Sequence, residues 1–129
     1  MNLLDNCYNS YKILVIDDDL FIQMQLRLYL EREGYEVVIV SSGEEGIEAY
    51  TKHHPDLVLS DAIMPNMNGF EFVAKVRQHP EYQELPIILV TSLTKDEDKR
   101  RGAQVGANAY IVKDQFNQEM LIETLDRLV

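Results

Sequence analysis

The sequence predicts a three-layer α/β domain, and three observations lead to that prediction. Five short runs of aliphatic and β-branched residues have the character of strands buried on both faces of a sheet. A segment with helical spacing follows each run, and this alternation indicates right-handed parallel crossovers with helices on both faces of the sheet. The length of 129 residues and the hydrophobic content of 46% suit one domain with a single core. Five strands at this length favour the flavodoxin-like (βα)5 fold, whose parallel sheet has the strand order 2-1-3-4-5.

The first strand and the first helix have clear boundaries in the sequence. Ile13–Ile16 is an unbroken apolar run, and helical spacing continues from Leu20 to Glu33. Gly34 then occupies the position after a helix where a left-handed backbone is common. A second apolar run, Val37–Val40, predicts another buried strand.

Caps and turn residues define the next elements. Ser42 and the glutamate three residues later have the spacing of a capping box, which predicts a helix that ends before Pro55. Leu57–Leu59 is the third predicted strand, and it leads through Asp61 and the sequence MPNMNG into a stiff loop. Asn68 begins another capped helix, which a His-Pro pair ends.

The fourth unit contains the helix with the least apolar surface. Ile87–Val90 is the predicted strand, and Thr94 with the glutamate three residues later forms a third predicted capping box. The helix that follows, Lys95–Val105, is dense in charge and has few apolar side chains to bury beyond those of Ala103 and Val105. We therefore expect it to be the least stable helix of the domain.

The fifth unit completes the predicted domain. Gly106 ends the charged helix, Tyr110–Val112 is a short fifth strand, and Asn117–Leu128 carries an apolar stripe at helical spacing. Residues 1–11 show no periodicity and are expected to form an N-terminal tail. The domain is therefore placed at residues 12–129.

Composition argues against several classes of function. A net charge of -10 disfavours direct contact with nucleic acid, which needs clustered lysine and arginine. The single cysteine, Cys7, cannot form an internal disulfide, and no apolar run approaches the roughly 20 residues of a membrane span. The N-terminal segment also lacks the basic residues of a signal peptide. We expect a soluble cytoplasmic protein that does not insert into membranes.

Polar residues follow the predicted strands, and the carboxyl ends of parallel strands share one edge of a sheet. The residues expected to converge there are Asp17, Asp18, Asp61, Thr91, Ser92 and Lys113. In this strand order the ligand crevice lies between the first and third strands, which end in the three acids. Neighbouring carboxylates repel one another and raise their pKa values unless a cation neutralises them. All-oxygen ligation favours Mg²⁺ or Mn²⁺ over zinc.

With such an ion bound, Asp61 can attack phosphorus as a carboxylate nucleophile. Lys113 would share the charge of the transferred group, and Thr91 or Ser92 would donate a hydrogen bond. Each residue also has a simpler interpretation, because acids after a strand are often helix caps, as we expect for Asp19, and polar strand ends are often only solvated. The joint pattern is more specific than any member of it.

The pattern at the strand ends resembles the receiver domain of two-component response regulators, over the chain from Lys12 to its C-terminus. The matching motifs are Asp17-Asp18, Asp61 followed by MPNMNG, Thr91-Ser92 and Lys113. The segment VKDQFNQEMLIETL resembles the receiver modules attached to chemotaxis-type hybrid kinases more than it resembles those of transcription regulators.

The resemblance implies a role for each residue of the motifs. Asp61 would be the phosphoacceptor. The implied magnesium ligands are Asp18, Asp61 and the backbone carbonyl of Ile63, with Asp17 reaching the ion through water. Thr91 and Lys113 would contact the phosphoryl group through their side chains and Ser92 through its backbone. Thr91 and Tyr110 would form the conformational switch.

The resemblance also implies partners. A sensor histidine kinase or a histidine phosphotransfer domain would supply the phosphoryl group, a downstream protein would receive the signal, and a phosphorylation-dependent homodimer is compatible with the family. The chain departs from the family where Asp114 replaces the usual proline after Lys113. A cis bond before a non-proline residue costs about 2.5–4 kcal/mol, so we expect this bond to be trans.

The first helix has more apolar residues than one core face needs. Its predicted core face consists of Ile22, Leu26, Tyr29 and Leu30. Phe21, Met24 and Leu28 lie nearly opposite and begin beside the acidic strand ends. They are either scattered surface residues, which are common, or a docking stripe for a helix of a partner protein.

Two other classes of function compete with a phosphoacceptor domain. One is an interaction module that keeps the fold and works without phosphorylation, but the intact set of acids, Thr91 and Lys113 argues against it. The other is a phosphatase that uses an aspartyl intermediate, but nothing in the sequence predicts a substrate lid. Magnesium titration would discriminate the first alternative, and multiple turnover of an added ester would discriminate the second.

Overall fold

The computed structural model describes residues 11–115 and 117–128, so Cys7 and nearly all of the predicted tail lie outside the described residues. The strands are β1 (Lys12–Ile16), β2 (Glu36–Val40), β3 (Leu57–Ser60), β4 (Ile87–Thr91) and β5 (Ala109–Val112). The helices are α2 (Leu20–Arg32), α3 (Gly43–His53), α4 (Gly69–Arg77), α5 (Asp96–Val105) and α6 (Gln118–Leu128), with short 3-10 helices η1 (Pro80–Tyr82) and η2 (Lys113–Gln115). In the described part of the chain, no helix is long and apolar enough to span a membrane.

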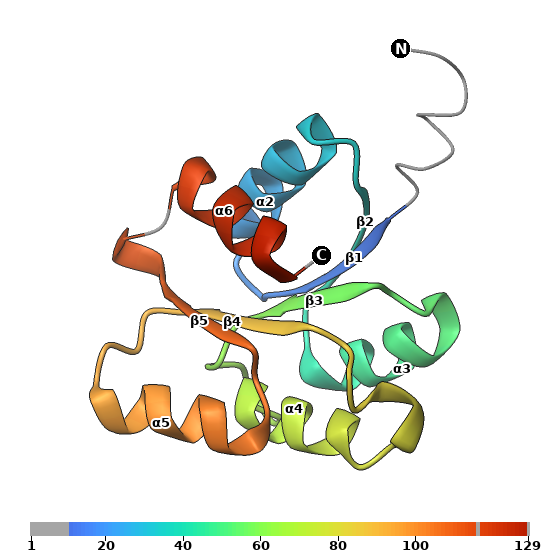
Figure 1. The fold of residues 1–129 in the computed structure, drawn as a ribbon, viewed down its shortest axis with the longest axis vertical. Helices are drawn as coiled ribbons and strands as arrows, with labels where there is room; N and C mark the ends of the chain where they lie inside the picture. The colour runs from blue at the N-terminus through green and yellow to red at the C-terminus, as the bar shows by residue number, and fades with distance from the viewer. Residues whose placement is uncertain (1–10, 116, 129) are drawn as a thin grey trace.

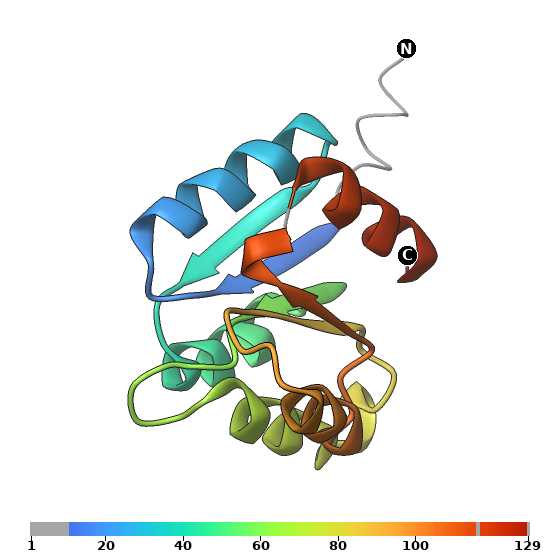
Figure 2. The ribbon, with the colours of Figure 1, turned by 90° about the vertical axis from the view of Figure 1, so that its left-hand side faces the viewer.

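The five strands form one parallel sheet in the order β2-β1-β3-β4-β5, which confirms the predicted fold. Helices α2 and α6 cover one face of the sheet, and α3, α4 and α5 cover the other (Figure 1; Figure 2). Side chains alternate between these layers along β1, because Ile13 and Val15 pack toward α2 and α6 while Leu14 and Ile16 pack toward α3 and α4. The central strands are therefore buried on both faces, as their unbroken apolar runs predict.

The prediction that Val37–Val40 forms a buried strand is confirmed only in part, because β2 lies at the edge of the sheet. All four of these residues are only partly buried. β2 pairs with β1 alone, so less of its surface is covered than in the central strands. An apolar run does not distinguish an edge strand from a central strand.

Most of the predicted helix boundaries are confirmed. Gly34 and Gly106 follow their helices with positive φ angles of 89° and 109°. Ser42 caps α3 by accepting a hydrogen bond from the Glu45 backbone N–H. Asn68 begins α4 with a complete capping box, in which Glu71 closes the reciprocal bond.

Two predictions about α5 are wrong. The helix begins at Asp96 with Lys95 at the N-cap position and no side-chain capping bond, so Thr94 lies one residue too early for a capping box. Ala103 is exposed, and the buried residue of α5 is Gly102, which lies against the side chains of Leu89 and Tyr110. The absence of a side chain at this glycine lets the helix lie close to β4 and β5, which the hydrophobic pattern does not reveal.

Candidate functional site

Two neighbouring strands bring the acidic side chains together. Asp17 follows β1 and Asp61 follows β3, and the backbone N–H of Asp61 donates to the carbonyl of Ile16 at 2.9 Å. One carboxylate oxygen from each of Asp17, Asp18 and Asp61 lies within 4.8 Å of the others. The predicted convergence of the three acids at the carboxyl edge of the sheet is therefore present.

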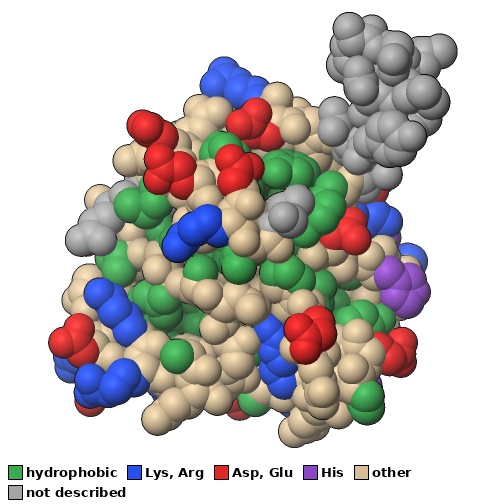
Figure 3. Space-filling view, viewed as in Figure 1, with side chains coloured by type: hydrophobic (Ala, Val, Ile, Leu, Met, Phe, Trp, Pro, Cys, Tyr) green, Lys and Arg blue, Asp and Glu red, His purple; other side chains and the backbone are tan. Residues whose placement is uncertain are grey.

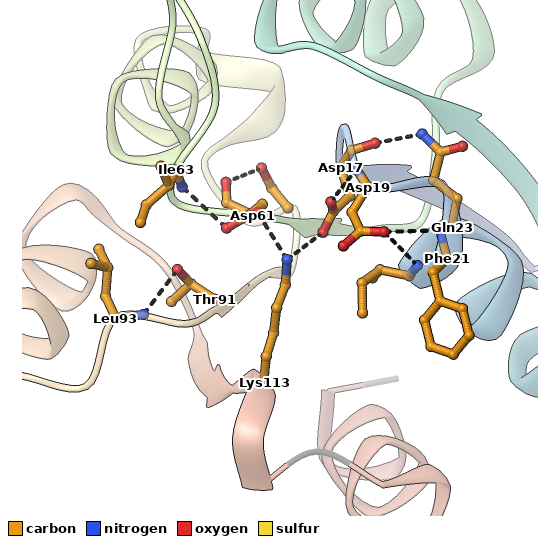
Figure 4. Close-up of polar contacts among 11 residues, drawn as sticks. Asp17, Asp19, Phe21, Gln23, Asp61, Ile63, Thr91, Leu93 and Lys113 are labelled. Carbon is orange, nitrogen blue, oxygen red and sulfur yellow. Dashed lines mark hydrogen bonds and ion pairs between the residues drawn. The ribbon is translucent and has the colours of Figure 1, made fainter.

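Lys113 reaches this cluster from β5, across the end of β4. Its Nζ lies 2.9 Å from Asp61 Oδ2 and 3.0 Å from Asp17 Oδ2, so one ammonium group bridges two of the carboxylates (Figure 4). The Lys113–Asp114 peptide bond is trans, as expected, and the chain continues directly into η2. Replacement of the usual proline therefore leaves the lysine in contact with the acids.

Burial sets the electrostatics of the cluster. The side chains of Asp17 and Asp61 are almost inaccessible to solvent, whereas Asp18 is exposed. Burial raises the pKa of Asp17 and contributes more than repulsion by Asp61 does. Burial is the largest single influence on Lys113 and lowers its pKa, but the hydrogen bonds to Asp61 and Asp17 and the negative charges of both together outweigh it, so the pKa is raised overall. The ammonium is thus held in its charged form between two carboxylates.

The cluster fits a hard divalent cation. Three carboxylates face one ammonium, which leaves negative charge uncompensated, and the donors of the cluster are all oxygens. Asp18 is open to solvent on one side, so water could complete the coordination of a bound ion. Asp61 Oδ1 accepts a hydrogen bond from the Ile63 backbone N–H at 3.1 Å, which orients the carboxylate within the loop.

Leu93 connects Thr91 to Tyr110. Thr91, at the end of β4, is fully buried, and its Oγ1 accepts a hydrogen bond from the Leu93 backbone N–H at 3.3 Å. The hydroxyl of Tyr110 on β5 donates to the Leu93 carbonyl at 3.1 Å. Ser92 is exposed in the bend between them. The two predicted switch residues are therefore joined through one peptide segment.

The apolar surface beside the site agrees with the predicted helix faces. On α2, Leu26 and Leu30 are buried and Ile22 and Tyr29 are partly buried. The opposite face exposes 71% of Phe21, 72% of Met24 and 50% of Leu28. Phe21 lies next to the acidic loop (Figure 4).

On the face drawn in Figure 3, basic side chains are interspersed with acidic and apolar ones and form no continuous patch.

Sequence reasoning missed two residues that contact the backbone of the site. Gly69, the first residue of α4, lies so close to the backbone of Asp61 and Ala62 that a Cβ there would overlap the Asp61 carbonyl oxygen. Gln23 on α2 donates a side-chain hydrogen bond to the Asp17 carbonyl. The Asn-Gly pair at Asn68 signals only a turn, and a glutamine at helical spacing signals only a helix surface, so neither contact was predictable.

The family model of the response regulator receiver domain matches residues 13–126. The chain belongs to this family. Receiver domains are signalling modules of two-component systems rather than classical enzymes, and they interact with histidine kinases or phosphotransfer proteins. The resemblance found in the sequence is thereby confirmed.

Individual relatives include a chemotaxis protein and the receiver domain of a histidine kinase. Protein PilH of Pseudomonas aeruginosa is 30% identical over 92% of this chain and 97% of its own length. The structure of chemotaxis protein CheY4 of Vibrio cholerae is 38% identical, with a TM-score of 0.87 over 93% of this chain and 99% of CheY4. The receiver domain of a signal transduction histidine kinase of Syntrophus aciditrophicus is 29% identical, with a TM-score of 0.85 over 92% of this chain and 89% of that domain. This chain spans 15% to 54% of the length of four other curated relatives.

Proposed function

We propose that Asp61 accepts a phosphoryl group from the phosphohistidine of a sensor kinase or a phosphotransfer domain. A carboxylate oxygen of Asp61 attacks phosphorus, the P–N bond breaks, and the imidazole retains the electron pair. Hydrolysis of the acyl phosphate by water then releases inorganic phosphate and restores the carboxylate. The convergence of Lys113 and three carboxylates at the end of β3 is the observation that supports this proposal most directly.

The proposal assigns a divalent cation to the acidic cluster. Asp18, Asp61 and the Ile63 carbonyl would hold Mg²⁺, or Mn²⁺, with Asp17 acting through water. The bound ion would neutralise charge on the carboxylates and on the phosphoryl oxygens. Lys113 stays within reach of Asp61 to pair with the transferred group, while Thr91 and the backbone of Ser92 contribute hydrogen bonds.

We assign the switch to Thr91 and Tyr110. When Thr91 turns toward the phosphoryl group, its bond to the Leu93 N–H is lost, and the Leu93 carbonyl that holds Tyr110 moves with the same segment. Tyr110 can then turn further inward, which changes the surface of α5 and β5. This surface would pass the signal to a downstream protein or to a second copy of the chain.

Phe21, Met24 and Leu28 form the proposed docking stripe for the phosphodonor. Their exposed face starts beside the acidic loop, so a helix of the donor that lies along it would bring its histidine close to Asp61. The net charge of -10 favours a protein partner over nucleic acid. We place this exchange in the cytoplasm.

Treatment with acetyl phosphate and Mg²⁺ tests the proposal. The wild-type chain should gain one phosphoryl group, roughly 80 Da, and Asp61→Asn should not. Asp56→Asn is the matched control, because Asp56 lies at the other end of the sheet, where it accepts a bond from the Lys12 N–H. Undiminished uptake by Asp61→Asn would refute the proposal. Absence of uptake by the wild-type chain with Mg²⁺ bound would favour the phosphorylation-independent module.

A further inference from the structure

One glutamine side chain on α2 joins two loops at the edge of the sheet that carries the acids. The Nε2 of Gln23 donates to the backbone carbonyl of Asp17 (Figure 4). The same nitrogen donates to Ser41 Oγ at 3.1 Å, in the segment between β2 and α3. Both N–H groups of the amide are therefore used, and each is directed at a different loop.

The other polar atoms of Asp17 already have partners. The backbone N–H of Asp17 donates to the carbonyl of Val40 at 3.2 Å. The Oδ1 of Asp17 accepts from the Asp19 N–H at 2.9 Å, and the Oδ2 of Asp17 pairs with Lys113. The carbonyl of Asp17 is the remaining polar group, and Gln23 holds it. This carbonyl belongs to the peptide plane between Asp17 and Asp18, so its direction determines how both carboxylates leave the backbone.

The second contact of Gln23 is also anchored. Ser41 donates its own backbone N–H to Glu45 Oε1 at 3.1 Å, and Glu45 lies in the first turn of α3. Gln23 is partly buried. The amide of a fully solvated glutamine on a helix surface would donate to water, whereas Gln23 donates to two protein groups from two loops. The contacts instead form a continuous connection from α3 through Ser41 and Gln23 to the Asp17–Asp18 peptide.

We propose that Gln23 is a positioning residue for the divalent cation site. It fixes the plane of the Asp17–Asp18 peptide, so that both carboxylates and Asp61 are oriented toward one ion before that ion binds. The inference rests on the proposed function, since it needs the acidic cluster to bind a cation. Groups that hold metal ligands in place typically contribute about 10-fold to 100-fold to metal affinity.

Isothermal titration calorimetry of the full chain with Mg²⁺ alone tests this role. Gln23→Met keeps the length of the side chain and removes both donors, and it should weaken Mg²⁺ binding at least about tenfold. Ser41→Ala removes only the second contact and should weaken binding less. Gln25→Met makes the same chemical change on the same helix, where Gln25 donates to the Tyr29 hydroxyl, and it should leave Mg²⁺ affinity unchanged. Far-UV circular dichroism in EDTA checks folding, and Gln23→Ala replaces Gln23→Met if the latter does not fold.

Free energies of unfolding in EDTA separate positioning from general support of the helix. If Gln23→Met and Gln25→Met have similar stability and only the first loses Mg²⁺ affinity, the positioning role is established. Faster amide exchange at Asp19 in metal-free Gln23→Met would support it independently, because that N–H donates to Asp17. Wild-type affinity in Gln23→Met, or equal losses in both glutamine variants, would overturn the inference alone. A wild-type chain that binds no Mg²⁺ would overturn the proposed metal site and this inference together.

Discussion

Ile63 lies two residues after Asp61, is 49% exposed, and donates its backbone N–H to Asp61 Oδ1. We expect its side chain to lie near the path by which water would reach a phosphoryl group on Asp61. Leu93, two residues after Thr91, is partly buried, and in the view of Figure 4 it lies on the same side of Asp61 as Ile63. Neither side chain can orient a water molecule through a hydrogen bond, and both exclude solvent. We therefore expect a slow loss of the phosphoryl group, and a shorter phosphoryl half-life in Ile63→Asn, measured after removal of the phosphodonor.

Two checks accompany this prediction. Mg²⁺ affinity should be nearly unchanged in Ile63→Asn, because the proposed ligand at this position is a backbone carbonyl. Ile63→Val keeps an apolar branched side chain and should retain a half-life close to that of the wild type. An equal or longer half-life in Ile63→Asn would contradict the role assigned to Ile63.

Asp17 and Asp18 are adjacent but differ in their surroundings. The Asp17 carboxylate is buried and already paired with Lys113 and the Asp19 N–H, whereas Asp18 is exposed at the same cluster. Since Asp18 is the proposed direct ligand, Asp18→Ala should weaken Mg²⁺ binding by at least about tenfold, or about 1.4 kcal/mol. Asp17→Ala should weaken it less. Calorimetry of both variants measures this difference, and equal losses would show that the assignment of direct and water-mediated ligands is wrong.

At the scale of the elements, the start of α4 determines where Asp61 lies. In Gly69→Ala the new Cβ would overlap the Asp61 carbonyl, and the neighbouring atoms are backbone, which cannot move aside as a side chain can. We expect a loss of about 1–3 kcal/mol in the free energy of unfolding and slower phosphorylation of Asp61. Urea unfolding and the rate of uptake from acetyl phosphate measure the two effects.

Gly102→Ala is the control for this substitution. A Cβ at Gly102 would meet the side chains of Leu89 and Tyr110 at 3.2 Å, where small shifts are available. The gain in helix propensity, at most about 1 kcal/mol, offsets part of that cost. Gly102→Ala should therefore be less destabilised than Gly69→Ala. The reverse order would mean that close backbone approach does not constrain the start of α4.

The segment from α5 to β5 should respond to phosphorylation as a unit. α5 has only Gly102 buried and no side-chain cap, so it is held weakly, and the Leu93 segment connects its start to both switch residues. We expect hydrogen exchange across residues 95–112 to change when a phosphate mimic and Mg²⁺ are added. Exchange in α3 should stay the same. Unchanged exchange over residues 95–112 would contradict this prediction and would mean that another face, with α2 as the first candidate, changes on phosphorylation.

The helix boundaries show what local sequence can and cannot predict. Gly34, Gly106 and the Asn68 capping box were predictable because each acts through its own backbone or its nearest neighbours. The capping box at Thr94 was predicted wrongly, because the helix begins one residue later than that spacing indicates, with Lys95 at the N-cap position. Exposure of Ala103 depends on the rotation of α5 over the sheet, which only the packing of Gly102 reveals.

At the scale of the whole molecule, the site was predictable because topology brings distant residues to one place. Parallel strands end at one edge, so Asp17 and Asp61 had to lie near one another once the strand order was inferred. The bridge from Lys113 to both acids depends on the length and direction of one side chain across β4. The contact of Gln23 with Asp17 depends on how α2 lies against two loops. Neither geometry is encoded in residue spacing.

The central claim is that this assembled edge makes Asp61 the phosphoacceptor. The most direct measurement is to treat the wild-type chain with acetyl phosphate and Mg²⁺, reduce the acyl phosphate with borohydride, and locate the reduced residue by tandem mass spectrometry. We expect reduction at Asp61 alone, and none when EDTA replaces Mg²⁺. Reduction at Asp17, Asp18 or a carboxylate elsewhere, or equal labelling of Asp61 in EDTA, would contradict the claim.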